Sequence, residues 1–339
     1  MQPNFLPGRF STAPMVDLTD RHCLFFWRLL TRRALLYTEM ISTDAIINGA
    51  RDQLLDYGQV AYPVALQLGG NDPDDMAFCA LEGQRRGFAE ININAGCPSP
   101  RVQNGCFGAV LMSQSARVGA CIRRMKEKGV TIPVTVKCRN GIDSLDDYEF
   151  LRRFVSDVAE SGASGVIIHA RQAFLKGLSP RENRDKPPMD YQKVYRIKRE
   201  YPDLFVSVNG EIRTLDDALA HLEKADGVML GRGAYQNPYL LAEVDERIFG
   251  EKNAPKPARE EILERMIPYA EDYAKKGGKI SNITRHMLDL YASLPGARTF
   301  RRTLSQEAVK PGADAAVIRK AMEAMSRARR DAEDQEEIR

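Results

Sequence analysis

Eight short apolar runs alternate with longer segments between residue 10 and about residue 250 of the 339-residue chain. The runs have the length and composition of buried β-strands, which we expect at residues 10–14, 35–39, 64–67, 90–94, 134–138, 165–169, 205–209 and 227–230. Amphipathic patterns between them predict helices at 73–86, 118–128, 146–161, 191–200 and 214–221. This alternation is typical of a (β/α)8 barrel, or TIM barrel. A doubly wound sheet is the main alternative, but it usually has fewer strands, and the chain lacks its glycine-rich dinucleotide turn.

The alternation ends at the segment 253–257, which reads NAPKP. Beyond it the apolar residues recur with helical spacing, and we expect helices at 259–275, 281–293, 299–307 and 313–330. The acidic stretch 331–337 is expected to be a frayed tail. The sequence therefore predicts an α/β barrel domain over residues 1–250, followed by an all-helical domain over residues 251–339.

The composition excludes several classes of protein. The first ten residues lack the pattern of a signal peptide, and no window is apolar for the length of a membrane span. Six cysteines without a CxxC spacing fit neither a disulfide framework nor a zinc site. We therefore expect a cytoplasmic protein with no membrane partner and no metal.

Charge is unevenly distributed along the chain. The formal net charge is only +3, but residues 275–330 hold thirteen Lys or Arg against four Asp or Glu. A local basic block on a nearly neutral chain suggests a polyanionic partner, although a solvated helical surface with no partner would show the same charge pattern.

The segment ININAGCPSPRVQNGCFGAVLM, residues 91–112, holds the most specific motif. Alternating residues run up to Asn94, and the strand pattern then breaks into a short loop with Cys97 between Gly96 and Pro98. Gly96 permits a close backbone approach or a positive φ, and Pro98 fixes the next turn. A thiol held rigidly at the end of a strand is a candidate proton donor or nucleophile, although most free cysteines simply pack in the core. A second thiol, Cys106, lies in a glycine-rich turn and is expected to serve packing.

Polar residues close most of the expected strands. In a barrel these ends converge on one face, where a cluster of buried polar groups is costly unless a ligand pairs with it. Glycine turns follow the last two strands, where barrels commonly hold a phosphate at a helix N-terminus, and Arg232 adds a bidentate cation. A phosphate there and a cation at mid-barrel fit a flavin mononucleotide. Pyridoxal phosphate, with Lys137 as the Schiff base, is the competing cofactor. The strand-end and turn residues concerned are Ala13, Pro14, Met15, Gln67, Asn94, Lys137, Arg139, His169, Asn209, Gly210, Glu211, Gly231 and Arg232.

These motifs together resemble the tRNA-dihydrouridine synthase family. The resemblance rests on APM at 13–15, LQLGG at 66–70, ININAGCPSPRVQNGCFGAVLM at 91–112, VTVKCRNGID at 134–143, HAR at 169–171, VNGEI at 208–212 and LGRGAYQNP at 230–238. Its most specific part is the Asn-x-Gly-Cys-Pro motif at 94–98. The stretches KGLSPRENRDKPPMDY at 176–191 and GARTFRR at 296–302 are similar to the A-type subfamily. The resemblance covers essentially the whole chain, including the C-terminal helices.

The resemblance implies an enzyme that reduces the C5=C6 bond of uridines in the tRNA D-loop, at positions 20 and 20a for the A-type subfamily. FMN would be the bound cofactor and NADPH the transient reductant. A hydride would pass from flavin N5 to uracil C6, and Cys97 would give a proton to C5 as general acid. The implied FMN-binding residues are Ala13, Pro14, Met15, Gln67, Lys137, His169, Asn209, Gly210, Glu211, Gly231 and Arg232.

The same reading makes Asn94 and Arg139 candidates for holding the uracil base. The target uridine would have to flip out of the folded RNA, at a cost of a few kcal/mol. Phosphate contacts are expected from the loop after the sixth strand and from the helical domain, at Lys176, Arg181, Arg184, Arg298, Arg301 and Arg302. A monomer is expected, because the enzyme must bind around the elbow of a tRNA.

Two other functions fit part of the sequence. A flavin barrel enzyme that reduces a free pyrimidine would explain Cys97 and the polar strand ends, but not the basic helical extension. An RNA-binding protein with a vestigial flavin site would explain the basic block, but not the intact strand ends. A metal enzyme has little support.

Overall fold

The computed structural model describes residues 6–58, 60, 62–253 and 256–337, which form two compact units. The first unit comprises the chain up to Thr19 together with Arg33–Gly231, and the second comprises Asp20–Arg32 together with the chain from Arg232 onward. Residues 254 and 255 of the expected NAPKP linker lie outside the described residues.

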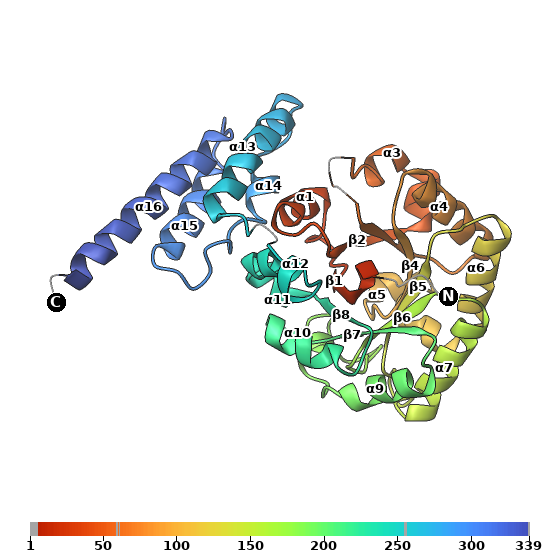
Figure 1. Ribbon diagram of the computed structural model, residues 1–339. Helices are drawn as coiled ribbons and strands as arrows, with labels where there is room; N and C mark the ends of the chain where they lie inside the picture. Colours follow the sequence, from red (N-terminus) through yellow and green to blue (C-terminus); the bar gives the residue numbers. More distant parts are fainter. Residues whose placement is uncertain (1–5, 59, 61, 254–255, 338–339) are drawn as a thin grey trace. The chain divides into compact units, whose positions relative to one another are not determined.

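The first unit is a closed barrel of parallel strands in the order β1 to β8 (Figure 1). Each strand lies within a few residues of its predicted range: β1 (Phe10–Thr12), β2 (Leu35–Ser42), β3 (Val64–Gly69), β4 (Glu90–Ala95), β5 (Val134–Arg139), β6 (Gly165–His169), β7 (Phe205–Asn209) and β8 (Gly227–Leu230). Strands β1 and β8 pair directly and so close the barrel. The expectation of a TIM barrel is confirmed.

Helices lie outside the strands of this unit, as expected for a barrel (Figure 1). Asp72, Asp147 and Thr214 cap α4, α7 and α10 by accepting hydrogen bonds from backbone amides of the first turn. The principal helices are α4 (Pro73–Arg85), α6 (Ser115–Glu127), α7 (Tyr148–Glu160), α9 (Tyr191–Glu200) and α10 (Leu215–Leu222). Shorter helices are η1 (Leu6–Arg9), α2 (Thr43–Asn48), α3 (Arg51–Leu54), α5 (Pro100–Asn104), η2 (Gly108–Ser113) and α8 (Glu182–Asp185).

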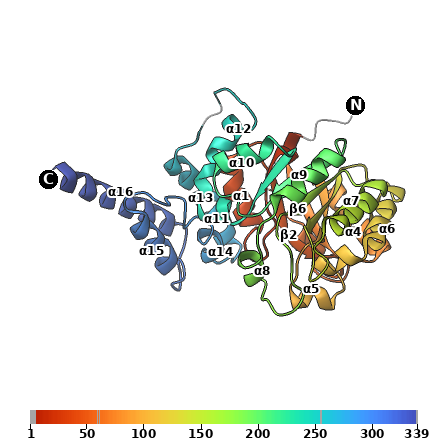
Figure 2. The ribbon, with the colours of Figure 1, turned by 90° about the horizontal axis from the view of Figure 1, so that it is seen from below.

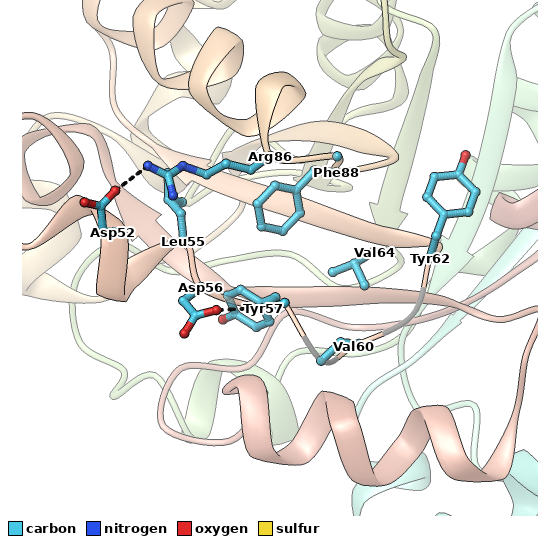
Figure 3. A pocket seen from close by; sticks show the side chains of 11 residues that line it. Asp52, Leu55, Asp56, Tyr57, Val60, Tyr62, Val64, Arg86 and Phe88 are labelled. Atoms are coloured by element: carbon cyan, nitrogen blue, oxygen red, sulfur yellow. Dashed lines mark hydrogen bonds and ion pairs between the residues drawn. The ribbon is translucent and has the colours of Figure 1, made fainter. Parts of the chain in front are cut away.

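The barrel has a small apolar core that lies below the polar strand ends. Its members come from six of the strands or from residues next to them: Ala13, Leu35, Tyr37, Ala65, Ala89, Ile167 and Met229. A separate cavity of about 570 Å³ lies at the amino ends of β3 and β4, where Val64 begins β3 and Phe88 precedes β4 (Figure 3). None of the expected site residues lines it.

The described part of the second unit consists of helices joined by turns, with no strand. It contains α1 (Arg21–Leu30), α11 (Arg232–Gln236), η3 (Pro238–Glu243), α12 (Val244–Arg247), α13 (Arg259–Lys275), α14 (Ser281–Thr284), α15 (Ala297–Glu307) and α16 (Ala316–Glu337). Helices α15 and α16 pack side by side (Figure 2). No helix among the described residues is long and apolar enough to cross a membrane.

Helix α1 precedes β2 in the sequence but belongs to the helical unit. This helix is not predicted from the sequence. Asp20 caps the helix by accepting from the amides of His22 and Cys23. The same carboxylate lies 2.6 Å from Nη2 of Arg285 and 3.0 Å from Nε2 of His286. One side chain therefore fixes both the start of α1 and its attachment to the C-terminal helices.

Two expectations about the C-terminal helices are wrong. The helix expected at 281–293 ends at Thr284, and the chain continues through successive turns with bonds such as Met287 N to Thr284 O and Leu290 N to Met287 O. Apolar residues spaced three apart are compatible with such turns as well as with an α-helix, so the hydrophobic pattern could not distinguish the two structures. The expected frayed tail is instead the end of α16, which continues to Glu337 because Ala, Glu and Gln are strong helix formers.

Candidate active site

The barrel brings the polar strand ends together on one face, as predicted. Adjacent strands place Asn94 of β4 beside Lys137 of β5, and the register continues from Arg139 to His169 and from His169 to Asn209. Parallel strands in a closed barrel all point their carboxyl ends the same way, so these five side chains surround a single opening.

The loops after β1 and β8 adjoin at this face. The amide of Ala13 donates to the carbonyl of Leu230 at 2.7 Å. A methyl group on Gly231 would lie 3.4 Å from the Cβ of Ala13 and 3.7 Å from the sulfur of Met15. The motif APM, in which Pro14 follows Ala13, and the turn after β8 thus form one wall of small residues. Arg232 follows directly but begins α11 and belongs to the second unit.

Lys137 is a half-buried cation whose hydrogen-bond partner is neutral. Its Nζ lies 3.1 Å from Oδ1 of Asn209, whose Nδ2 donates to the carbonyl of Met229 at 2.8 Å. Desolvation, followed by the charge of Arg139, lowers the pKa of Lys137 to about 8. An ammonium in this setting gains from an anionic ligand, because burial alone disfavours its charge.

Hydrogen bonds tie the Cys97 loop to Asn94 and to Ala109. Oδ1 of Asn94 accepts from the amides of Gly96, at 3.1 Å, and Cys97, at 3.0 Å. The carbonyl of Cys97 accepts from Ala109 at 2.9 Å, and Gly108 approaches that carbonyl so closely that a Cβ would lie 2.5 Å from it. Gly96 serves close approach rather than a positive φ, since a Cβ there would lie 3.3 Å from the backbone of β5. Cys97 itself is half-buried.

Cys106 does not pack in the core as expected. It has a φ of 55° and its side chain is exposed, because the left-handed turn directs it away from the barrel. The carbonyl of Cys106 accepts from Asn71 at 2.9 Å.

Arg139 lies buried beneath the Cys97 loop. Its Nε donates to the carbonyl of Gly96 at 3.1 Å, and its Nη1 donates to that of Asn183 at 3.1 Å. Desolvation lowers its pKa to about 10, with the Cys97 thiol acting in the opposite sense. Gln103 makes a parallel link, because its Nε2 lies 2.7 Å from the carbonyl of Pro98 and 2.8 Å from that of Leu175.

These two side chains join the loop after β4 to the loop after β6. Figure 2 shows the short helices of these loops, α5 and α8, on the same side of the unit. The sequence predicted a ligand contact for Arg139 and did not reveal this second role, because backbone carbonyls carry no sequence signal.

The turn after β7 contains two consecutive residues with positive φ, Gly210 at 125° and Glu211 at 49°. A Cβ on Gly210 would lie 2.4 Å from Met189 and 3.4 Å from Nε2 of His169, so only glycine fits this turn. Glu211 forms a 2.7 Å ion pair with the buried Arg171. Arg171 follows the expected site residue His169 by two positions and was missed.

The expected RNA-contacting cations are all exposed. Lys176 and Arg181 lie in the loop after β6, and Arg184 lies in α8. Arg298, Arg301 and Arg302 lie in α15 of the second unit, where Arg301 is ion-paired with Asp289.

Comparison with known proteins identifies the family. The family model described as dihydrouridine synthase matches residues 11–327. The chain belongs to the dihydrouridine synthase family. It is an oxidoreductase of the tRNA-dihydrouridine synthase type and uses a flavin. The expected family membership and enzyme class are confirmed.

Curated relatives align over nearly their full length. A tRNA-dihydrouridine(20/20a) synthase of Yersinia pestis is 51% identical over 96% of this chain and 94% of its own. Those of Vibrio parahaemolyticus and Escherichia coli are each 52% identical, over 93% of this chain and 96% and 91% of theirs. A solved 2-naphthoyl-CoA reductase is 11% identical with a TM-score of 0.52, over 70% of this chain and 50% of that chain, and it supports the fold alone.

The residues of the strand ends fit a flavin. The partly desolvated ammonium of Lys137 suits an electron-rich ring, and Gly210 and Gly231 keep the walls after β7 and β8 free of side chains. Amide groups of Gln67 and Asn94 supply directional hydrogen bonds at the same face.

Proposed function

We propose that this protein reduces uridines 20 and 20a in the tRNA D-loop to 5,6-dihydrouridine, with FMN as its cofactor and NADPH as its reductant. The relatives that bear the corresponding name cover nearly the whole chain at about half identity, which supports the same targets here. The observation that carries the proposal is the half-buried Cys97 on a loop tied to Asn94, whose strand neighbour is the half-buried Lys137.

In this proposal the bound flavin supplies the hydride for C6 of the uracil ring. Cys97 holds the proton that C5 receives, and the hydrogen bonds from the Cys97 loop to Asn94 keep the thiol in place. Lys137 stabilises negative charge on the cofactor, because its own charge has no carboxylate to neutralise it in the contacts described above. Ala13, Pro14, Met15, His169, Gly210, Glu211, Gly231 and Arg232 complete the cofactor site.

We assign tRNA binding chiefly to the helical part, residues 251–339, and FMN binding to the barrel, residues 1–250. The exposed Arg298, Arg301 and Arg302 of α15, together with Lys176, Arg181 and Arg184, would neutralise phosphates. Asn94 and Arg139 would hold the flipped base. The protein would act as a monomer, and NADPH would reach the flavin before tRNA occupies the same opening.

The proposal is tested with tRNA that lacks dihydrouridine, incubated with NADPH and either wild-type protein or Cys97→Ala. Mass spectrometry of D-loop fragments should show a gain of two hydrogens at positions 20 and 20a with wild type, and a sharply slower gain with the variant. Reduction of free uracil with indifference to tRNA would instead favour a small-pyrimidine reductase. Equal gain with both proteins would remove Cys97 as the essential acid.

A further inference from the structure

A continuous row of buried polar side chains runs inside the barrel toward the Cys97 loop. Strand β4 supplies three of them, Glu90, Asn92 and Asn94, which alternate in sequence and therefore share one face. Nδ2 of Asn94 lies 2.8 Å from Oε1 of Gln67, and Nε2 of Gln67 lies 2.8 Å from Oδ1 of Asn92. Nδ2 of Asn92 lies 2.8 Å from the hydroxyl of Thr135, which donates in turn to Oε1 of Glu90.

The two ends of this row fix the direction of every hydrogen bond in it. At one end Asn94 accepts from two backbone amides, those of Gly96 and Cys97, which can only donate. At the other end Glu90 presents a carboxylate oxygen, which accepts from Thr135 and also from the hydroxyl of Tyr37. An inverted amide anywhere between would place two donors or two acceptors face to face.

Glu90 is fully buried, and this burial is costly for a carboxyl group. Its Oε2 has no hydrogen-bond partner among the described residues. Desolvation raises its pKa to about 7, so the group is neutral in part of the population near neutral pH. Its Oε1 can accept hydrogen bonds in either state, so the direction of the row is preserved.

We propose that Glu90, acting through Thr135 and Asn92, is a positioning residue that fixes the amide orientations of Gln67 and Asn94 and thereby holds the Cys97 loop. This inference rests on the proposed function for its catalytic consequence. Each amide of the row uses one of its two N–H groups within the row. The row therefore fixes the direction of the second N–H of Gln67 and of Asn94. Gln67 is the amide assigned to the flavin, and Asn94 is the amide assigned to the uracil.

The proposal separates the two half-reactions of the enzyme. Reoxidation of the reduced flavin by tRNA requires the proton of Cys97 and the base contact of Asn94, whereas reduction of the flavin by NADPH requires neither. The contact of Gln67 with the flavin serves both half-reactions, so it does not account for a difference between them. A disordered row should therefore slow reoxidation by tRNA much more than reduction by NADPH.

The test compares holoenzyme variants in anaerobic stopped-flow measurements of both half-reactions. Thr135→Val removes the hydroxyl at nearly constant volume, and Thr135→Ser restores it. Ser207→Ala is the matched control, because the Ser207 hydroxyl is also buried on a strand but makes no hydrogen bond among the described residues. Thermal melting checks that each variant is folded.

We expect Thr135→Val to slow reoxidation by tRNA on the order of 10²-fold, as a displacement near 1 Å does, and reduction by NADPH by less than about threefold. Thr135→Ser, Glu90→Gln and Ser207→Ala should stay within about threefold of wild type in both. Glu90→Gln keeps an acceptor oxygen for Thr135. If this folded variant were much slower than wild type, the charge of Glu90 and not the orientation of the amides would control the rate, and the proposal would be contradicted. Equal slowing of both half-reactions by Thr135→Val, or no slowing, would overturn the proposal.

Glu90→Leu tests the same point if Thr135→Val does not fold, because it removes the acceptor oxygen at the end of the row and replaces it with an apolar side chain of similar size. Slowed reoxidation by tRNA supports the row, and an unchanged rate contradicts it. The rate at which iodoacetamide alkylates Cys97, followed by peptide mass spectrometry, needs no tRNA. Faster alkylation in Glu90→Leu and Thr135→Val, with a wild-type protein that fails to reduce tRNA, would retain the positioning role and reject the proposed function.

Discussion

The Nζ atom of Lys137 reaches Oδ1 of Asn209 across the mouth of the barrel, at 3.1 Å. Lys137 lies on β5 and Asn209 on β7, and β6 separates these strands in the sheet. The ammonium therefore spans the strand between them and lies among the polar strand ends. Its position makes the charge available to a ligand that covers the strand ends.

The pKa of Lys137 makes flavin binding depend on pH. Because burial lowers this pKa to about 8, the side chain carries its charge below pH 8 and loses it as the pH rises through that value. We expect the affinity of the apoprotein for FMN, measured by fluorescence quenching, to weaken between pH 7 and pH 9. Lys137→Met should bind on the order of tenfold more weakly at pH 7 and show no such step. A step of equal size in this variant would assign the titration to another group.

Gly108 is expected to tolerate no side chain, because a Cβ would meet the Cys97 carbonyl at 2.5 Å. Its φ of 75° adds backbone strain. Gly108→Ala should slow dihydrouridine formation by at least about tenfold and lower the free energy of unfolding by about 1–3 kcal/mol. Gly87→Ala is the control for strain alone, because Gly87 has a φ of 83° with nothing within 4 Å of the added Cβ. If both variants were equally slow, the contact with Cys97 would not be the cause.

Glu90 should make the stability of the barrel depend on pH. Its pKa rises from 4.5 to about 7 on folding, so its contribution to stability is present below pH 4.5 and is lost as the pH rises through 7. Relative to wild type, Glu90→Gln should gain up to about 3 kcal/mol in the free energy of unfolding between pH 4.5 and pH 7.5. Urea titrations at several pH values measure this difference. A constant difference across the range would show that Glu90 does not titrate there.

Asp20 should stabilise the helical unit through charge as well as capping. Burial would raise its pKa, but the hydrogen bond and charge of His286, the amide of Cys23 and the guanidinium of Arg285 hold it well below its usual value. Asp20→Asn keeps the cap and should lower the free energy of unfolding by about 1–3 kcal/mol at pH 7. The loss should shrink as the pH falls below about 4, because the unfolded chain then binds a proton at Asp20 while the folded carboxyl, whose pKa is held lower, stays ionised. Asp72→Asn, at the N-cap of α4, should change stability by less than about 0.5 kcal/mol.

The arginines of α15 should contribute to tRNA affinity through phosphate contacts. Exchange of Arg298 and Arg302 for Gln should weaken binding and reduce the slope of log K against log salt by about 1 per residue. Filter binding at several salt concentrations gives the slope. The exchange Arg85→Gln, at an exposed ion pair of α4, is the control and should leave the slope unchanged. An unchanged slope in the double variant would place the tRNA elsewhere.

The strands were predictable because each is a short apolar run, and burial on both faces of a parallel barrel demands such runs. Helix α1 was not predicted, because ten residues between two strands gave no sign that they pack with helices far along the chain. The convergence of Gln67, Asn94 and Lys137 followed from the fold. Their mutual hydrogen bonds did not, although the alternation of Glu90, Asn92 and Asn94 was a signal that could have been used. The ion pair of Arg171 with Glu211 depends on two loops meeting, which spacing alone does not reveal.

Helix α1 constrains how this protein can be divided and how it is made. Its cap Asp20 pairs with Arg285, 265 residues later, and Trp27 packs edge-on against Tyr235. On the ribosome α1 therefore emerges long before these partners are synthesised. Its apolar face can be buried against them only late in translation. A fragment cut after β8 retains α1 without these partners, and the complementary fragment lacks α1. The helical unit can be expressed whole only as part of the uncut chain.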